Sequence, residues 1–453
     1  MRFKKIIYMS IFLISIPFFL TGCKTEVMKS PEKLLEKPIS NESNYRIYTE
    51  VRKLTPIDTS FVLPRNSNDV GKINIVDLNK DGHSQVIAFK KKINEEQGIG
   101  SIYMYLFENK RDKIINDSER MVRITGENLK SVNFVDIKGN GKKQIVLHVS
   151  NRGFENIYIY EYSGHNLKKI ADFSTSNFNI KLNFYRYNEG EKVRCLALLQ
   201  DDVNYNAYVS RMVLQDGEII FEKDQAIKDM DGLEKTEFVN GRVSKNIYGT
   251  MLVYQSFTGN INTEIIVFKD DKFHSVIDGD NIKMKNTIFM KPVDIDHDGV
   301  LDVPKIEFRY TNSTSMESNV ISWYQWNGNM SKKDGNMILR KQIYYCYDDN
   351  FKIAIPKKLE NKFYIQQYFE NNKSKFTFYY DNNEGEKKSL FRIDVIKKTA
   401  EDVESKTKND KLENVLIEDE NYRYIYEPID KDLLKEYSIT LEKIKKLISL
   451  INT

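Results

Sequence analysis

Short segments in which apolar and polar residues alternate recur along most of this chain. Segments such as SIYMYLFE (101–108), NIYIYEY (156–162) and TEIIVFK (263–269) are rich in aromatic and β-branched residues, and clusters of Gly, Asn and Asp separate them. Alternation of this kind predicts half-buried β-strands joined by turns. The strands come in groups of about four per ~54 residues, which predicts a repeat architecture.

A polar turn opens each predicted unit. Turns that begin at Asp77, Asp136 and Asp294 share a Val-Asp-hydrophobic start and a Gly at the sixth place counted from the Asp. Their spacing predicts two degenerate copies between them, with turns at 188–190 and 240–241. Five units of about four strands are typical of a β-propeller, so the expected fold is mainly β with a closed, five-bladed ring. A sandwich of irregular hairpins is the alternative.

The pattern changes after residue 347. Residues 351–429 predict several further strands, and residues 430–452 predict one helix capped by Asp430. The apolar residues of this helix form one stripe, which consists of Leu433, Leu434, Tyr437, Leu441, Ile444, Ile448 and Ile451. The simplest expectation is that the stripe covers an antiparallel sheet. A helix on the membrane surface is the alternative, suggested by Lys443, Lys445 and Lys446.

The N-terminus predicts export. Arg2, Lys4 and Lys5 precede an apolar run of about fifteen residues, which is short for a membrane-spanning helix of about 20 and is interrupted by Pro17. The run ends in LTGC, which resembles the bacterial lipobox. The resemblance implies cleavage before Cys23 and lipidation of its sulfur. An ordinary signal peptide with an incidental cysteine is the alternative.

Lipid on Cys23 would anchor the chain to the extracytoplasmic face of the cell membrane without spanning it. The predicted organisation is then a signal peptide (1–22), a lipidated cysteine with a polar, flexible tether (23–44), the propeller domain (45–347) and a small α+β domain (348–453).

The turn at Asp294 concentrates acidic residues in VDIDHDGVLDVP (293–304). Asp294, Asp296, Asp298 and Asp302 lie close together, and Gly299 permits a sharp turn. Such carboxylates repel one another, and a hard cation with six to eight oxygen ligands removes the repulsion.

The acidic turn resembles the FG-GAP/VCBS class, whose repeats carry D-x-D/N-x-D-G-x-x-D. The resemblance implies one structural Ca²⁺ held by these four aspartates, with the carbonyl of Val300 as a further ligand. An EF-hand does not fit, because its twelfth position is Lys305 instead of Glu and the flanks are strand-like. A solvated acidic turn without an ion is the alternative.

The other two turns are weaker matches. The first offers Asp77, Asn79 and Asp81 but ends in Gln85, so a second, weaker calcium site is expected there. The turn at Asp136 keeps no further acid, and the ligand positions hold Lys138, Asn140 and Gln144. No ion is expected in this turn, where the ammonium of Lys138 could occupy the place of the cation.

Charge and cysteine content narrow the function further. The net charge is +4, and removal of residues 1–22 leaves about +1, which argues against a nucleic-acid partner. Cys195 and Cys346 lie in apolar segments without a CxxC or Cys/His pair, so buried thiols are expected and a zinc site is not. A disulfide between the two is the alternative.

No catalytic motif is present, and each histidine stands apart from other candidate groups in the sequence: His83, His148, His165, His274 and His297. The chain resembles surface lipoproteins of Gram-positive bacteria. We therefore expect a membrane-anchored, calcium-stabilised, non-enzymatic binding or scaffolding module with a protein or glycan partner. An extracellular hydrolase that uses carboxylates on the propeller face, and a purely structural envelope protein, are the alternatives.

Overall fold

The structure is a computed structural model. It describes residues 42–65, 70–92, 100–110, 113–115, 121–188, 190–277, 281, 284–307, 318–331, 336–370, 373–381, 387–398 and 414–451. The predicted signal peptide, Cys23 and most of the predicted tether lie outside these residues. Among the described helices, none combines the length and apolar character that crossing a membrane requires.

The fold is mainly β, and its strands form six antiparallel sheets. In the first sheet, β3 (Gln85–Lys92) and β4 (Ser101–Lys110) are central, flanked by β1 (Thr59–Phe61), β2 (Ile73–Val76), β5 (Lys113–Ile115) and β6 (Met121–Thr125). The second contains β7 (Asn128–Val135), β8 (Gln144–Asn151), β9 (Phe154–Ser163) and β10 (Asn166–Thr175). The third contains β11 (Phe178–Tyr185), β12 (Arg194–Asp201), β13 (Ala207–Gln215) and β14 (Glu218–Ile227).

The remaining sheets extend this order along the chain. The fourth contains β15 (Thr236–Ser244), β16 (Ile247–Gln255), β17 (Ile261–Lys269), β18 (Lys272–Ile277) and the short β19 (Lys285–Asn286). The fifth contains β20 (Val303–Glu307), β21 (Ser318–Trp326), β22 (Met337–Cys346), β23 (Phe351–Ala354) and β29 (Ile448–Leu450). The sixth contains β24 (Phe363–Glu370), β25 (Lys373–Asp381), β26 (Lys387–Lys397), β28 (Tyr422–Pro428) and β27 (Val415–Glu418), and a 3-10 turn, Lys357–Leu359, precedes it.

Successive sheets pack face to face, and each pair encloses an apolar cluster. Phe89 of the first sheet and Leu147 of the second share one cluster, while Val146 and Ala197 belong to the cluster between the second and third sheets. Similar clusters join the third sheet to the fourth and the fourth to the fifth. Central strands such as β8 and β12 are therefore buried on both faces, which explains why they read as continuous apolar runs in the sequence.

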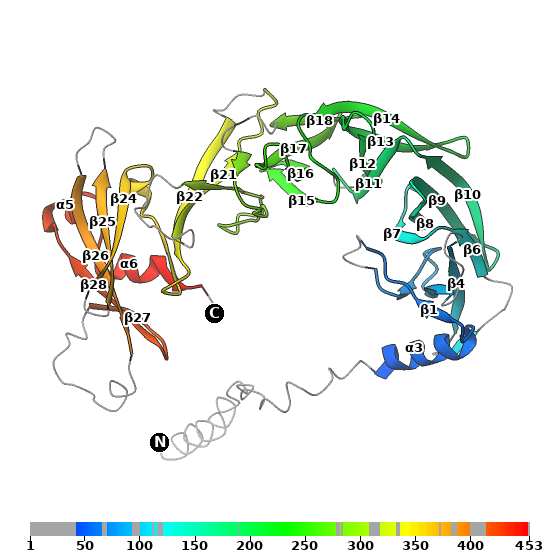
Figure 1. Cartoon of the computed structure of the whole chain (residues 1–453), viewed down its shortest axis with the longest axis horizontal. Coiled ribbons are helices and arrows are strands. Elements are labelled where there is room, and N and C mark those ends of the chain that lie inside the picture. Colours follow the sequence, from blue (N-terminus) through cyan, green and yellow to red (C-terminus); the bar gives the residue numbers. More distant parts are fainter. Residues whose placement is uncertain are drawn as a thin grey trace, which may run out of the picture.

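The sheets follow one another around an open arc, whose first and last sheets lie at opposite ends (Figure 1). The repeated four-stranded units are as predicted, but the closed ring is not observed. The free face of the first sheet is covered by helix α3 (Glu42–Leu54), where Val51 packs against Val86 and Ala88. Terminal units of a stacked fold need such a cover. The helix begins inside the stretch predicted to be a tether, so that tether ends earlier than expected.

The C-terminal segment differs from the prediction of one long helix. It forms two short helices, α5 (Lys431–Glu436), which Asp430 caps as expected, and α6 (Leu441–Leu447), followed by strand β29. The break lies at Ser438, whose φ is +56°, and at Thr440, whose side chain caps α6 by accepting a hydrogen bond from the backbone N–H of Lys443. The helical prediction for residues 448–450 is wrong because β29 pairs with β23 of the fifth sheet, and residue 452 lies outside the described residues.

The fifth and sixth sheets share one apolar core with these helices. Tyr344 and Phe351 of the fifth sheet meet Phe376 of the sixth, and Ile444 of α6 is fully buried in the same cluster. The apolar stripe of this segment therefore packs on protein. The boundary predicted at residue 347 falls inside the fifth sheet, because β23 pairs with β22.

Cys195 and Cys346 are both buried and free, as predicted. Burial raises the pKa of the Cys195 thiol far above its usual range. The Sγ of Cys346 lies 3.7 Å from Oδ2 of Asp349 and donates a hydrogen bond to it. The alternative of a disulfide between them is wrong.

Candidate metal centre

The acidic turn precedes the fifth sheet and is closed by a bridge between Val293 and Asp302. The backbone groups of these two residues exchange hydrogen bonds of 3.2 and 2.8 Å. The carboxylate of Asp294 accepts hydrogen bonds from the backbone N–H groups of Asp298 and Gly299, at 3.0 and 2.9 Å. Gly299 has a φ of +83°, which supports the predicted reason for a glycine here.

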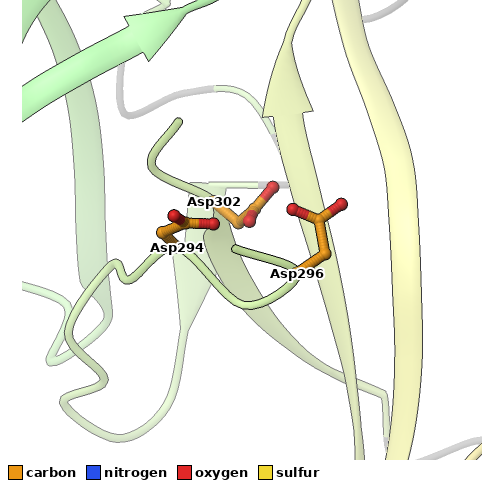
Figure 2. A group of neighbouring side chains, drawn as sticks. All are labelled: Asp294, Asp296 and Asp302. Atoms are coloured by element: carbon orange, nitrogen blue, oxygen red, sulfur yellow. The ribbon is translucent and has the colours of Figure 1, made fainter. Parts of the chain in front are cut away.

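Three carboxylates converge on the inside of this turn. One oxygen from each of Asp294, Asp296 and Asp302 lies within 4.8 Å of the other two. Figure 2 shows the three side chains arranged around one region, with Asp302 between the other two in this view. A separation of this size suits oxygens that share one cation with ligand distances of about 2.3–2.6 Å.

Asp302 is the most informative member of the group because it is fully buried. Its Oδ2 accepts a hydrogen bond of 3.1 Å from the backbone N–H of Ile295, while its Oδ1 is buried without a hydrogen-bond partner. Burial, together with the smaller effect of the charges of Asp296 and Asp298, raises the pKa of Asp302 to about 7. A buried carboxylate oxygen without a partner is costly, and a bound cation would supply that partner.

Asp298, the fourth predicted carboxylate ligand, is not part of the converging group. Its Oδ1 accepts a hydrogen bond of 2.9 Å from the backbone N–H of Val300, and its Oδ2 accepts one of 3.1 Å from the Nε2 of Gln325. Arg340 of β22 reaches the same turn, where its Nη2 lies 2.8 Å from Asp296 and 3.0 Å from Asp298.

Arg340 was not foreseen from the sequence. It follows Asp296 by 44 residues, and only the pairing of β21 with β22 brings it to the turn. The hydrogen bond to Asp296 raises the pKa of the Arg340 guanidinium, which therefore stays charged. Its positive charge offsets part of the repulsion between the aspartates.

The turn at Asp77 repeats the backbone arrangement with a different closing residue. Asp77 accepts hydrogen bonds from the N–H groups of Lys80 and Gly82, and the second of these corresponds to the bond that Asp294 accepts from Gly299. Gln85 takes the position of Asp302, and its Oε1 accepts a hydrogen bond of 3.0 Å from Leu78 N–H. Its Nε2 donates a second bond of 3.0 Å to the carbonyl of His83.

The turn at Asp136 has the same closure. Gln144 accepts a hydrogen bond from Ile137 N–H and donates one to the carbonyl of Lys142, each at 3.0 Å. With the first Asp of each turn counted as position one, the glutamine amide thus bonds both the backbone N–H of the second residue and the carbonyl of the seventh residue. The carboxylate of Asp302 can accept from the N–H but cannot donate to the carbonyl. Lys138 does not take the place of a cation, because its Nζ pairs with Glu161 of β9 at 2.5 Å.

The second calcium site predicted at Asp77, Asn79, Asp81 and Gln85 remains a prediction. Asn79 Oδ1 is buried without a hydrogen-bond partner, but Asn79 Nδ2 donates to Asp81 at 2.7 Å. In the part of the chain that the structure describes, the converging group of three acids occurs only at the Asp294 turn.

Of the two degenerate turns, one is where the sequence placed it and the other is not. Residues 186–193 connect β11 to β12, which fits the turn predicted at 188–190. Residue 189 itself lies outside the described residues. Residues 240 and 241 lie within β15, and the turn falls at 245–246. A Cβ on Gly241 would lie 2.9 Å from Cδ1 of Leu301, which is too close. The glycine therefore allows Leu301 of the acidic turn to pack against β15.

Comparisons with known proteins add little to this geometry. No family model and no curated protein matches the chain. Similar solved structures include a protein from Lactobacillus plantarum, with 10% identity over 67% of this chain and 81% of that chain and a TM-score of 0.29. A hypothetical protein from Leishmania major has 11% identity over 67% of this chain and 94% of that chain, with a TM-score of 0.24. AofleA from Arthrobotrys oligospora has 10% identity over 75% of this chain and 92% of that chain, with a TM-score of 0.26.

Proposed function

We propose that this chain is a lipid-anchored, extracytoplasmic binding or scaffolding module that holds one structural Ca²⁺ in the Asp294 turn and acts without catalysis. The observation that supports the ion most directly is the buried Oδ1 of Asp302, which lacks a partner beside two further carboxylates. The anchor rests on the LTGC segment that ends at Cys23.

The donor set favours calcium over other cations. Asp294, Asp296 and Asp302 offer only oxygen atoms, and rotation of Asp298 together with the Val300 carbonyl would extend the set toward the six to eight oxygens that Ca²⁺ prefers. Extracellular sites of this kind bind with dissociation constants of about 10⁻⁴–10⁻³ M. Millimolar calcium outside the cell would fill most of such sites.

Arg340 and the ion would share Asp296 and Asp298. The side chain of Arg340 is about one-third exposed, and surface ion pairs contribute only about 0–1 kcal/mol, so its displacement costs little. The guanidinium would neutralise the turn when calcium is scarce, and the ion would replace it when calcium is plentiful.

A pair of exposed aromatic side chains supports a partner-binding role. Tyr205 and Phe257 come from neighbouring sheets, and their rings contact edge to face at 6.2 Å although each residue is more than half exposed. Exposed aromatic groups of this kind are enriched where proteins bind partners. Val203, two residues before Tyr205 in the chain, is also exposed.

Calorimetric titration of Ca²⁺ into the chelator-treated full chain in a neutral detergent tests the proposal. One ion per chain is expected, and Asp296→Asn should weaken binding by about tenfold or more, because it removes one charged ligand. Asp201→Asn is the matched control, because Asp201 only caps a turn through Val203 and Asn204 N–H. Absence of calcium binding, or equal binding by the two variants, would contradict the proposed site.

A further inference from the structure

A basic cavity lies between helix α3 and the first sheet, far along the chain from the acidic turn. Its volume is about 740 Å³, within the range of small-molecule sites. Lys90 of β3 lines it together with Arg52, Lys53 and Lys72, and the rings of Tyr48 and Phe61 form an apolar wall. No acidic residue is among the described residues that line it.

Lys90 is the unusual member, because its side chain is almost fully buried. Its Nζ donates hydrogen bonds to Thr55 Oγ1 at 2.7 Å and to the Pro56 carbonyl at 3.2 Å, and lies 5.0 Å from the centre of the Phe61 ring. These partners are neutral, and Asp58 attracts the ammonium only from a greater distance. Burial of an ammonium without a carboxylate partner is costly.

Nearby negative charge does not balance the four cations. Lys53 pairs with Glu50 at 2.9 Å, whereas no ion pair involves Arg52 or Lys72 among the residues that the structure describes. The C-terminus of α3 contributes about −0.5 of an elementary charge. Arg52, Lys72 and Lys90 together exceed the combined charge of this helix end and Asp58. The cavity therefore carries a net positive charge.

We propose that this cavity binds a phosphate ester, with the phosphate on the cations and the attached organic group against Tyr48 and Phe61. A doubly charged tetrahedral anion can accept a bidentate pair of hydrogen bonds from Arg52 and further bonds from Lys72. The buried ammonium of Lys90 adds a further positive charge that attracts the anion. The rings of Tyr48 and Phe61 lie 5.2 Å apart at 34°, which gives a continuous apolar surface beside the cations. The cavity is larger than a bare phosphate requires.

Two sources offer this chemistry. One is a soluble phosphorylated molecule, and the other is the headgroup of an anionic phospholipid. Among the described residues, no hydrogen bond joins α3 or β3 to the Asp294 turn, so we expect binding at this site to be independent of calcium.

Titration calorimetry on the full chain in a neutral detergent tests the site, with glycerol 3-phosphate and dihexanoyl phosphatidylglycerol as probes. At equal ionic strength set with chloride, at least one probe should bind to the native chain. Tighter binding of glycerol 3-phosphate identifies a soluble ligand. Tighter binding of the short lipid, with none of dihexanoyl phosphatidylcholine, identifies a headgroup.

Arg52→Gln and Lys90→Met should each weaken binding of the phosphate ester by about tenfold or more, because each removes a charge-assisted contact. Arg52 is exposed, so its variant tests the site even if loss of Lys90 disturbs the fold. Lys91→Met is the matched control, since Lys91 points to the opposite face of β3 and donates to the Glu127 carbonyl. Failure of both probes to bind, or unchanged affinity in Arg52→Gln, would overturn the proposal.

Discussion

Replacement of Asp302 by glutamine should make the acidic turn independent of calcium while preserving its shape. Gln85 and Gln144 occupy the same position in the two other turns, and each joins the second-position N–H to the seventh-position carbonyl. A glutamine at 302 should likewise accept from Ile295 N–H and donate to the carbonyl of Val300. The amide would then occupy the place that we assign to the ion.

The expected size of the effect follows from mass action. At about 10 mM Ca²⁺, which is about a hundredfold excess over a dissociation constant of about 10⁻⁴ M, the ion stabilises the native state by about 2.7 kcal/mol. If about 400 residues unfold together with an entropy of about 2.1 cal/mol/K per residue, this corresponds to a change in Tm of about 3 °C. Removal of calcium should lower the Tm of the native chain by this amount and leave the Tm of Asp302→Gln unchanged.

The same substitution should also stabilise the calcium-free state. A carboxyl group whose pKa rises from 3.8 to about 7 on folding destabilises the fold by up to about 4 kcal/mol at neutral pH, because the folded state disfavours the charged form. Glutamine carries no charge and avoids this cost. In chelator, Asp302→Gln should therefore melt at or above the temperature of the native chain.

Thermal melts followed by circular dichroism, in about 10 mM Ca²⁺ and in excess chelator, measure both effects. Asp201→Asn is the control and should keep the native response to chelator, because Asp201 lies in an ordinary turn. The reasoning is refuted if Asp302→Gln retains the native response, or if the native chain melts at the same temperature in both conditions.

Three further predictions concern other parts of the chain. Cys23→Ala should abolish labelling with a palmitate analogue in a bacterial host, and labelling that persists would show that Cys23 is not lipidated. Arg340→Gln should tighten calcium binding by up to about fivefold in a calorimetric titration, because the ion no longer has to displace a guanidinium whose pairing contributes about 0–1 kcal/mol; weaker binding would show that Arg340 supports the site. His148 is buried beside Glu155, which also pairs with Lys130. Burial lowers the pKa of His148 below 6.5, so on acidification the unfolded state takes up a proton that the folded state does not. Stability should therefore fall as the pH drops below 6.5, and His148→Gln should lack this loss in urea melts; equal pH profiles would refute it.

The acidic turn was predictable from the sequence because its geometry is local. The Asp294 carboxylate accepts hydrogen bonds from residues only four and five positions away. The spacing of the aspartates and Gly299 therefore contains most of the information that determines the shape of the turn. The repeating strands were predictable for the same reason, since a four-stranded antiparallel unit joins neighbours along the chain.

Features that depend on distant contacts could not be predicted. Arg340 reaches the turn only through strand pairing, and Lys90 becomes buried only because α3 folds back over the first sheet. Helix α3 itself did leave a signal: Ile47, Val51 and Leu54 recur at helical spacing, but their polar surroundings resemble a tether. The helix break at Ser438 could not be predicted, because apolar residues continue at helical spacing past it and into β29.

The five-bladed ring was expected from repeat number alone, and repeat number does not determine closure. Closure requires that the outer face of the first unit meet the last unit. Here Val86 and Ala88 on that face pack against α3, so the face is already covered. A stack whose end face is covered by a helix can remain open without exposing its core.

The residue at the ninth position of the turn explains why a strong acidic cluster coexists with weaker copies. Every turn must satisfy a buried N–H at its second position, and Gln85, Gln144 and Asp302 all do so. The glutamines also bond the seventh-position carbonyl, and their second atom is therefore satisfied by the protein itself. Asp302 has an oxygen where they have an NH₂ group, and the oxygen of an ionised carboxylate cannot donate to a carbonyl. The cation that we propose would lie between this oxygen and the Val300 carbonyl, and the neighbouring acids would then be useful only in this turn.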